Sequence, residues 1–184
     1  MKSSYRFVAL LSTVALAVGA TTAFAHSGGG HHGRGHGNRH GGEILRSALV
    51  GSTPTAAGGP TLFGVPPGGA AWTIGESQAR VRADRVRVRG EALLLANGTT
   101  GPVQMVAAAV FCNDSTTPAF TSNAVPLDPD GDFRVDQDVT TPLPSPCLAP
   151  AVLVRITQAD NAPVANGPYI AATGGNAPAA APMP

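Results

Sequence analysis

Apolar and polar residues alternate in the middle of the chain, which is the pattern of a β-strand with one buried face. Residues 77–82 read SQARVR, and residues 85–95 begin with RVRVRG. In both segments Ala or Val recurs at every second position, and Arg occupies most of the positions between. We therefore predict two half-buried strands, each with arginines on its exposed face.

Short apolar runs between Gly, Pro and Asn residues predict further strands. The run at residues 103–112 is apolar on both faces, so its strand is expected to be central or covered. The other predicted strands span 120–127, 132–139, 151–156 and 164–171, and two edge segments span 45–50 and 61–65. Many short strands and no helical period predict an all-β protein, namely a small antiparallel β-sandwich over residues 43–173.

The two ends of the sequence lack the large apolar residues that a core needs. Residues 26–42 read HSGGGHHGRGHGNRHGG and form a His/Gly-rich leader, whereas residues 174–184 form a tail rich in Ala and Pro. Neither segment can bury enough apolar surface to offset the entropy lost on folding. We therefore expect disordered N- and C-terminal tails on either side of the sandwich.

Residues 1–25 have the parts of a secretory signal peptide. Lys2 and Arg6 supply the positive end, an apolar run covers 14 residues from Phe7 to Ala20, and Ala23-Phe24-Ala25 is a small-residue cleavage site. A membrane-spanning helix needs about 20 apolar residues, so this run is short for an anchor, and an uncleaved anchor is the alternative interpretation. The sequence predicts a secreted, extracytoplasmic protein that starts at His26 and has no membrane association after cleavage.

The charge balance narrows the range of partners. Because Lys2 and Arg6 leave with the signal peptide, 10 of the 12 basic residues remain, all arginines, against 11 acidic residues, for a net charge of −1. A protein that binds nucleic acid through a global basic field carries a clear positive excess. No nucleic-acid partner is therefore expected.

Cys112 and Cys147 are the only cysteines in the sequence. In an exported protein such a pair is expected to form a disulfide. Cys112 ends one predicted strand and Cys147 precedes another, so this bond could tie the two sheets together. The order of elements resembles an immunoglobulin-like sandwich in layout at most, because Trp72 precedes both cysteines instead of lying between them.

The sharpest feature of the predicted sandwich is a row of arginines at positions 80, 82, 85, 87 and 89. If Ala83-Asp84 forms a turn, Arg82 lies opposite Arg85 and Arg80 lies opposite Arg87, and like charges in such positions cost stability. One interpretation is a solvated salt-bridge lattice with the Asp-rich strand at residues 132–139. The other is an anion-binding face for a cell-wall polymer, a sulfated polysaccharide or phosphate. Its candidate residues are Arg80, Arg82, Arg85, Arg87 and Arg89.

All histidines of the chain lie in the leader, at His26, His31, His32, His36 and His40. Imidazoles on a flexible chain are good ligands for Cu, Ni or Zn, so the leader is either a metal-capturing segment or a soluble spacer. Metal binding predicts an affinity that disappears when residues 26–42 are deleted, as a titration of the two proteins would show. The sandwich itself is not expected to require a cofactor.

The same distribution of histidines argues against most catalysis. A Ser-His-Asp or Cys-His site needs a fixed base, and neither His nor Lys occurs in residues 43–173. A carboxylate-dependent enzyme using Glu76, Glu91 or the Asp cluster stays open. The loop DPDGD at residues 128–132 is expected to be a hairpin turn, because it lacks the Gly and Glu positions of an EF-hand calcium site. The favoured hypothesis is a secreted, non-catalytic binding or structural module.

Overall fold

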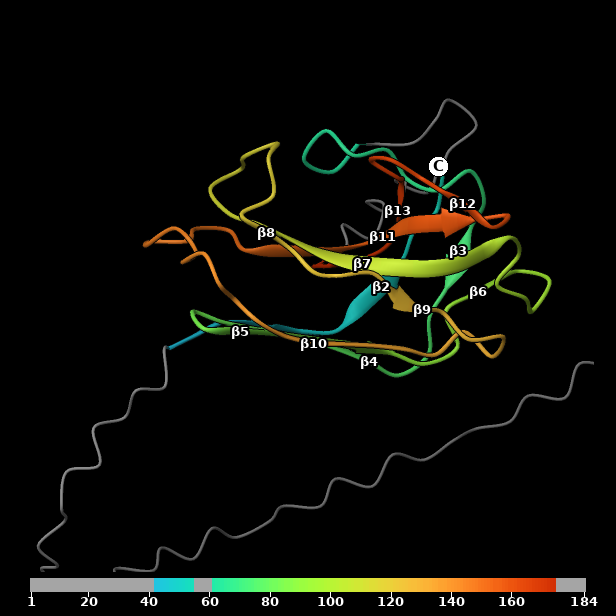
Figure 1. The fold of residues 1–184 in the computed structure, drawn as a ribbon, viewed down its shortest axis with the longest axis horizontal. Helices are drawn as coiled ribbons and strands as arrows, with labels where there is room; N and C mark the ends of the chain where they lie inside the picture. Colours follow the sequence, from blue (N-terminus) through green and yellow to red (C-terminus); the bar gives the residue numbers. More distant parts are fainter. Residues whose placement is uncertain (1–41, 55–60, 175–184) are drawn as a thin grey trace, which may run out of the picture. The chain divides into compact units, whose positions relative to one another are not determined.

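The computed structural model describes residues 42–54 and 61–174. Within these ranges the regular secondary structure consists of β-strands. Two antiparallel sheets pack face to face (Figure 1). The predicted all-β sandwich is thus confirmed. The predicted signal peptide lies outside the described residues, as do the leader and the tail apart from Gly42 and Gly174.

The two sheets differ in size. The four-stranded sheet has the order β1-β4-β5-β10, with β1 Glu43–Ser47, β4 Ser77–Arg82, β5 Arg85–Gly90 and β10 Phe133–Asp138. The seven-stranded sheet has the order β2-β13-β11-β7-β8, with β2 Leu49–Gly51, β13 Tyr169–Thr173, β11 Ala151–Ala159, β7 Val103–Phe111 and β8 Phe120–Thr121. In that sheet β9 (Val125–Pro126) pairs with β7, and β12 (Ala162–Pro163) pairs with β11. A separate pair consists of β3 (Trp72–Thr73) and β6 (Leu94–Leu95).

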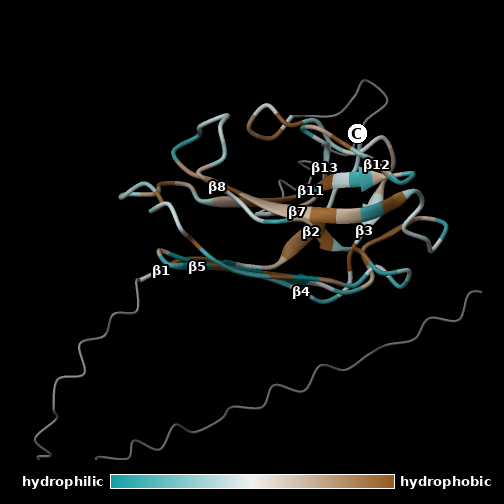
Figure 2. Ribbon diagram, viewed as in Figure 1, coloured by the Kyte–Doolittle hydropathy of each residue, from teal (hydrophilic) through white to brown (hydrophobic). Residues whose placement is uncertain are grey.

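The core lies between the two sheets and follows the two-residue period of the strands. The four-stranded sheet contributes small and branched side chains that are at most 1% exposed, namely Ala79, Val81, Val86 and Val88. The seven-stranded sheet contributes side chains that are also at most 1% exposed, namely Val106, Ala108, Val110, Val152 and Val154. Each buried Val stabilises the fold by about 1.5–3 kcal/mol. Hydrophilic residues occur along the strands of the four-stranded sheet (Figure 2), and in β5 they alternate with the buried ones.

The strand β7 is covered on both faces, as its sequence predicts. Its outer face packs against the segment at residues 61–68, where the ring of Phe63 stacks on Phe111 with centroids 4.8 Å apart. This segment is not the predicted edge strand. Leu62 and Val65 exchange two backbone hydrogen bonds of 3.0 and 2.9 Å around Phe63 and Gly64, both at positive φ. Such a turn suits a tight two-residue hairpin, and here it forms a cover over the sheet.

Several predicted strands have different limits in the structure, and the predicted edge segment 45–50 is divided between β1 and β2, which lie in different sheets. The strand predicted at 85–95 ends at Gly90, and residues 94–95 form the separate strand β6. The Phe133 ring covers Gly90, where an added Cβ would be 2.5 Å from Cε1. Two short strands, β8 and β9, replace the strand predicted at 120–127. The last strand begins at Tyr169 instead of residue 164. Gly167 and Pro168 directly precede the last strand, whereas the three residues between β8 and β9 include neither glycine nor proline.

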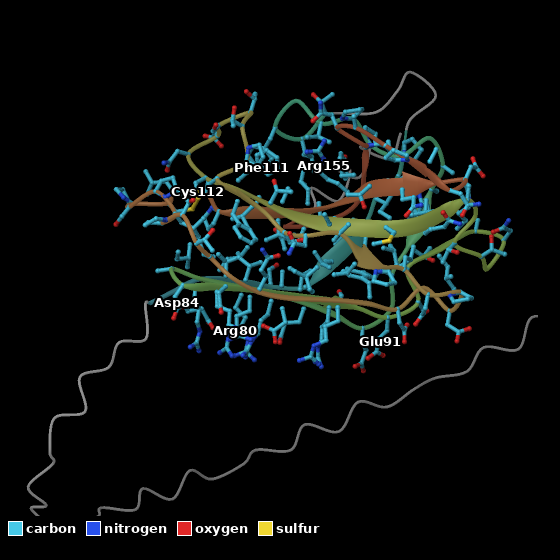
Figure 3. All side chains as sticks on the ribbon, in the orientation of Figure 1. Arg80, Asp84, Glu91, Phe111, Cys112 and Arg155 are labelled. Atoms are coloured by element: carbon cyan, nitrogen blue, oxygen red, sulfur yellow. A yellow bond between two sulfur atoms is a disulfide. The ribbon has the colours of Figure 1, made fainter. Side chains whose placement is uncertain are left out.

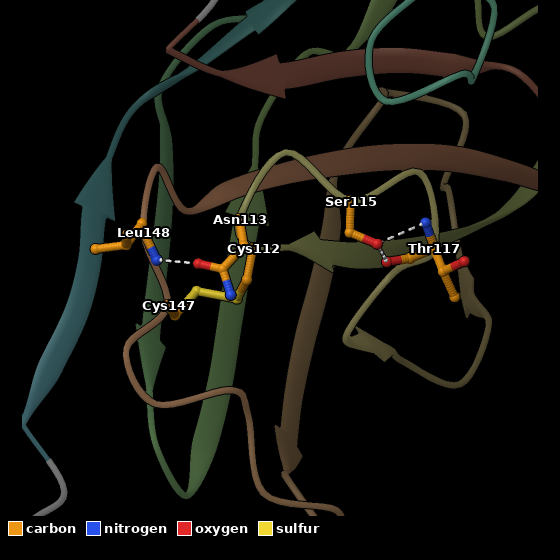
Figure 4. The surroundings of a disulfide bond; sticks show 6 residues. All are labelled: Cys112, Asn113, Ser115, Thr117, Cys147 and Leu148. Carbon is orange, nitrogen blue, oxygen red and sulfur yellow. Dashed lines mark hydrogen bonds between the residues drawn. A yellow bond between two sulfur atoms is a disulfide. The ribbon is translucent and has the colours of Figure 1, made fainter.

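The predicted disulfide between Cys112 and Cys147 is present, with Cα atoms 5.0 Å apart (Figure 4). Its expected role in tying the two sheets together is wrong, because the strands next to it, β7 and β11, are neighbours in one sheet. The bond instead fixes the connection that leaves β10 and enters β11. Beside it, the Leu148 amide donates to Asn113 Oδ1 at 2.7 Å, and the Asn113 amide donates to the Leu148 carbonyl at 2.8 Å.

One further observation bears on the cellular location. A disulfide is consistent with an oxidising, extracytoplasmic environment. Within residues 42–54 and 61–174 the structure has no helix long and apolar enough to cross a membrane.

Candidate anion-binding face

The hairpin of β4 and β5 has the register that the sequence predicts. Arg80 lies directly opposite Arg87, and the buried Val81 lies opposite Val86. Only Ala83 and Asp84 separate the two strands, so Arg82 and Arg85 flank the turn. The arginines therefore share the outer face of the sheet, where Figure 3 shows Arg80 pointing away from the sandwich.

The acidic strand β10 lies beside β5, also as predicted. Asp136 is opposite Arg87, and Asp138 is opposite Arg85. The third pair in this register joins Arg134 to Arg89, so two guanidiniums face each other at one end of the sheet. Acidic neighbours are therefore available to only part of the arginine row.

The fourth strand adds an arginine that the sequence reasoning missed. In β1, Arg46 is the register partner of Arg80, while Glu43 is the partner of Arg82. The sequence EILRS lacks a clear alternation, so nothing local places it beside the arginine hairpin. Within these four strands, seven arginines and three acidic residues lie on the outer face, a formal charge of +4, while Glu91 and Asp132 line the adjoining hollow together with Arg89 and Arg134. This arginine face consists of Arg46, Arg80, Arg82, Arg85, Arg87, Arg89 and Arg134 with Glu43, Asp136 and Asp138.

One carboxylate organises the paired arginines. Asp136 Oδ1 accepts hydrogen bonds from Arg85 Nε at 2.6 Å and from Arg87 Nε at 3.1 Å, while Oδ2 lies 3.7 Å from Arg134 Nη2. The hydrogen bond from Arg85 is the main reason that the pKa of Asp136 is lowered from 3.8 to about 2. The hydrogen bond to Asp136 in turn raises the pKa of Arg85.

The lowered pKa of Asp136 predicts a loss of stability in acid. Its carboxylate is ionised more readily in the folded than in the unfolded chain, so its contribution is complete above pH 4 and disappears as the pH falls to about 2. We expect about 1 kcal/mol, because ion pairs near solvent are screened. Denaturant unfolding between pH 5 and pH 2 would measure it, with Asp136→Asn expected to flatten the dependence and Asp138→Asn to change it little. An equal slope in the wild type and in Asp136→Asn would contradict the assignment.

Two more ion pairs complete the network. Arg85 Nη1 lies 3.2 Å from Asp138 Oδ1, and Arg80 Nε binds Glu43. Arg46, Arg82 and Arg89 form no ion pair with any residue that the structure describes. The surface between the rows is hollowed to about 210 Å³, with Arg80, Arg87, Arg89 and Arg134 in its lining. The arginine face is thus a salt-bridge lattice with too few acids to complete it.

The other chemical candidates are less organised in the described residues. The DPDGD loop is a turn, but the hairpin turn that the sequence predicts is wrong, because β9 and β10 on either side of it lie in different sheets. Within the turn, Gly131 donates its amide to the Asp128 carbonyl at 2.9 Å, and Asp128 Oδ1 accepts the amides of Asp130 and Asp132 at 3.0 and 2.9 Å. This turn links β9 to β10 and so passes from one sheet to the other. Glu76 and Glu91 are both exposed, on neighbouring chain segments.

The metal hypothesis concerns a part of the chain that the structure does not describe. All five candidate ligands, His26, His31, His32, His36 and His40, lie outside residues 42–54 and 61–174. Within those ranges no group of three or more His, Cys, Asp or Glu side chains could hold a metal ion. Metal binding by the leader therefore stays a prediction.

Compared with protein-family models, with curated proteins and with solved structures, the chain has no match. A functional hypothesis must therefore be argued from the geometry of the arginine face.

Proposed function

We propose that this protein is a secreted, non-catalytic module that binds an anionic extracellular polymer through the arginine face. The observation that carries the proposal is the excess of seven arginines over three acidic residues on one sheet face. Guanidinium groups bind sulfate, phosphate and carboxylate in a bidentate manner, more specifically than an ammonium group does. A face whose basic residues are all arginines suits a ligand that has many sulfate, phosphate or carboxylate groups.

The spacing of the strands supports a polymer over a single small anion. Neighbouring strands lie about 4.8 Å apart, and alternate residues along a strand lie about 6.8 Å apart. Arg46, Arg80 and Arg87 form one row across three strands, and Arg89 and Arg134 form part of the next. A single anion could contact one opposed pair, whereas a chain of regularly spaced anions could contact both rows.

The cost of this arrangement is a second argument for binding. Like charges directly opposite each other in a sheet are destabilising. The structure contains three such pairs, namely Arg46 with Arg80, Arg80 with Arg87, and Arg89 with Arg134. A face that served only solubility could alternate its charges. The repeated conflict favours a ligand that supplies the missing anions.

Retention on a polyanion column would test the proposal. The mature protein is expected to bind immobilised dextran sulfate or polyphosphate in about 50 mM salt and to elute as salt rises, because binding releases counterions from the polymer. Neutral dextran is the control resin. Absence of retention on both polyanions at low salt, or equal retention on neutral dextran, would overturn the proposed function.

A further inference from the structure

A second, smaller site lies on the outer face of the seven-stranded sheet. There a cleft of about 260 Å³ opens between β11, the segment before β13 and the segment before β8. Arg155 is the only charged residue in its lining, which otherwise consists of small polar and apolar residues. Figure 3 shows Arg155 and Arg80 on opposite sides of the sandwich, so this cleft is separate from the arginine face.

The position of Arg155 leaves its charge without a counterion. The residue lies in β11 with Ala107 of β7 and Tyr169 of β13 as register partners, in the middle of the sheet. Its Nε donates to the Gly167 carbonyl at 2.9 Å, and no carboxylate of the described residues is within ion-pair distance. Burial lowers the pKa of this guanidinium. A partly buried cation held by a neutral carbonyl is an incomplete electrostatic arrangement.

The segment before β13 approaches β11 closely at Gly167, and the contact with the Gly167 carbonyl fixes the Arg155 guanidinium. A Cβ added at Gly167 would lie 2.0 Å from the Ile156 carbonyl oxygen, so only glycine allows this approach of the segment before β13 to β11. The Gly167 carbonyl can then hold Nε, and the four N–H groups of the two Nη atoms stay available for a ligand. Such an oriented guanidinium is suited to a planar carboxylate.

A buried hydroxyl in the same lining also lacks a partner. Thr157 contributes to the lining, while its Oγ1 is closed off from solvent and has no hydrogen-bond partner among the described residues. The pairing of β11 with β7 shifts register between Ile156 and Gln158, so Thr157 falls at an irregularity of the sheet. A buried hydroxyl without a partner costs about 1–3 kcal/mol. The lining of the cleft therefore includes a fixed cation, Arg155, and a residue with an unsatisfied donor, Thr157, two positions apart in β11.

We propose that this cleft binds the carboxylate of a small aliphatic acid, with Arg155 as the anion receptor and Thr157 as a hydroxyl donor. The apolar part of the ligand would lie against Ala107, Pro118 and Val164, which complete the lining. A carboxylate would pair with the guanidinium and would accept from the hydroxyl once the Thr157 side chain rotates toward the cleft, and an aliphatic chain matches the apolar lining. This site is independent of the arginine face and of the proposed polymer binding.

Titration with sodium hexanoate, followed through backbone amide signals in NMR spectra, would test the site. Saturable shifts are expected at residues 155–157 and 166–167, with hexanol as the uncharged control giving none. Arg155→Gln is expected to weaken binding at least tenfold, and Arg155→Lys should retain part of it. Arg46→Gln, on the arginine face, is the matched control and should bind as the wild type does.

A variant that keeps the shape of the lining separates binding from folding. Thr157→Val removes the hydroxyl at nearly constant volume, so we expect a higher melting temperature of the free protein together with several-fold weaker hexanoate binding. Because Thr157→Val leaves Arg155 in place, its result does not depend on the contact between Arg155 and Gly167. Hexanol binding as tight as that of hexanoate, or unchanged hexanoate affinity in Thr157→Val and Arg155→Gln, would overturn the proposal.

Discussion

Replacing Arg46, Arg82 and Arg89 together by glutamine is expected to weaken binding to a sulfated or phosphorylated polymer by about 100-fold near 0.15 M salt. These three arginines form no ion pair with the described residues, so their donors are available to a ligand. Each lost contact should also lower the slope of log affinity against log salt by about 0.9, for a total of about 3. Elution salt on dextran sulfate and titration at three salt concentrations would measure both quantities.

Stability distinguishes a binding face from a structural lattice. Removing unpaired arginines relieves repulsion, so the melting temperature of the triple variant should be unchanged or higher. Asp136→Asn is the opposite control, because it releases Arg85 and Arg87 and raises the charge of the face to +5. It should lower stability and strengthen polymer binding. A triple variant that loses stability and keeps its retention would favour the purely structural interpretation.

Local alternation was sufficient to predict the centre of the arginine face. The pattern RVRVRG directs Val86 and Val88 into the core, so Arg85, Arg87 and Arg89 had to point outward. The two residues between the arginine strands fixed their register, and the acidic residues of the 132–139 segment indicated the neighbouring strand. The reason is physical: a one-residue shift would bury every charge on the strand.

Contacts between distant segments were not predictable in the same way. Arg46 completes the face only because β1 pairs with β4, a choice that no local pattern in β1 specifies. The cover of residues 61–68 over Phe111 and the single-sheet position of the disulfide also depend on strand order. The cleft at Arg155 depends on the close approach of Gly167, which involves one glycine among 23 in the sequence.

Loss of the disulfide is the second change for which we predict a large effect. Replacing both Cys112 and Cys147 by alanine is expected to lower the free energy of unfolding by about 4 kcal/mol. The bond joins residues that are 35 positions apart, and the intervening chain includes β10 and both of its connections. Cross-linking them restricts the unfolded chain, and a loop of this length gives the stated magnitude in the chain-entropy model. Since small proteins have only about 5–15 kcal/mol of stability, this is a large share.

Urea unfolding of the wild type, of the wild type under reductant and of the double variant would measure this contribution. The reduced wild type and the variant should agree, because both have lost the same constraint on the unfolded chain. A loss below about 1 kcal/mol would contradict the prediction and would mean that folded-state contacts hold the connection into β11. The hydrogen bonds between Asn113 and Leu148 are the nearest such contacts. In that case Asn113→Ala, made in the double variant, would lower the free energy of unfolding by more than removal of the disulfide does. Under our prediction, Asn113→Ala lowers the free energy of unfolding by about 1 kcal/mol.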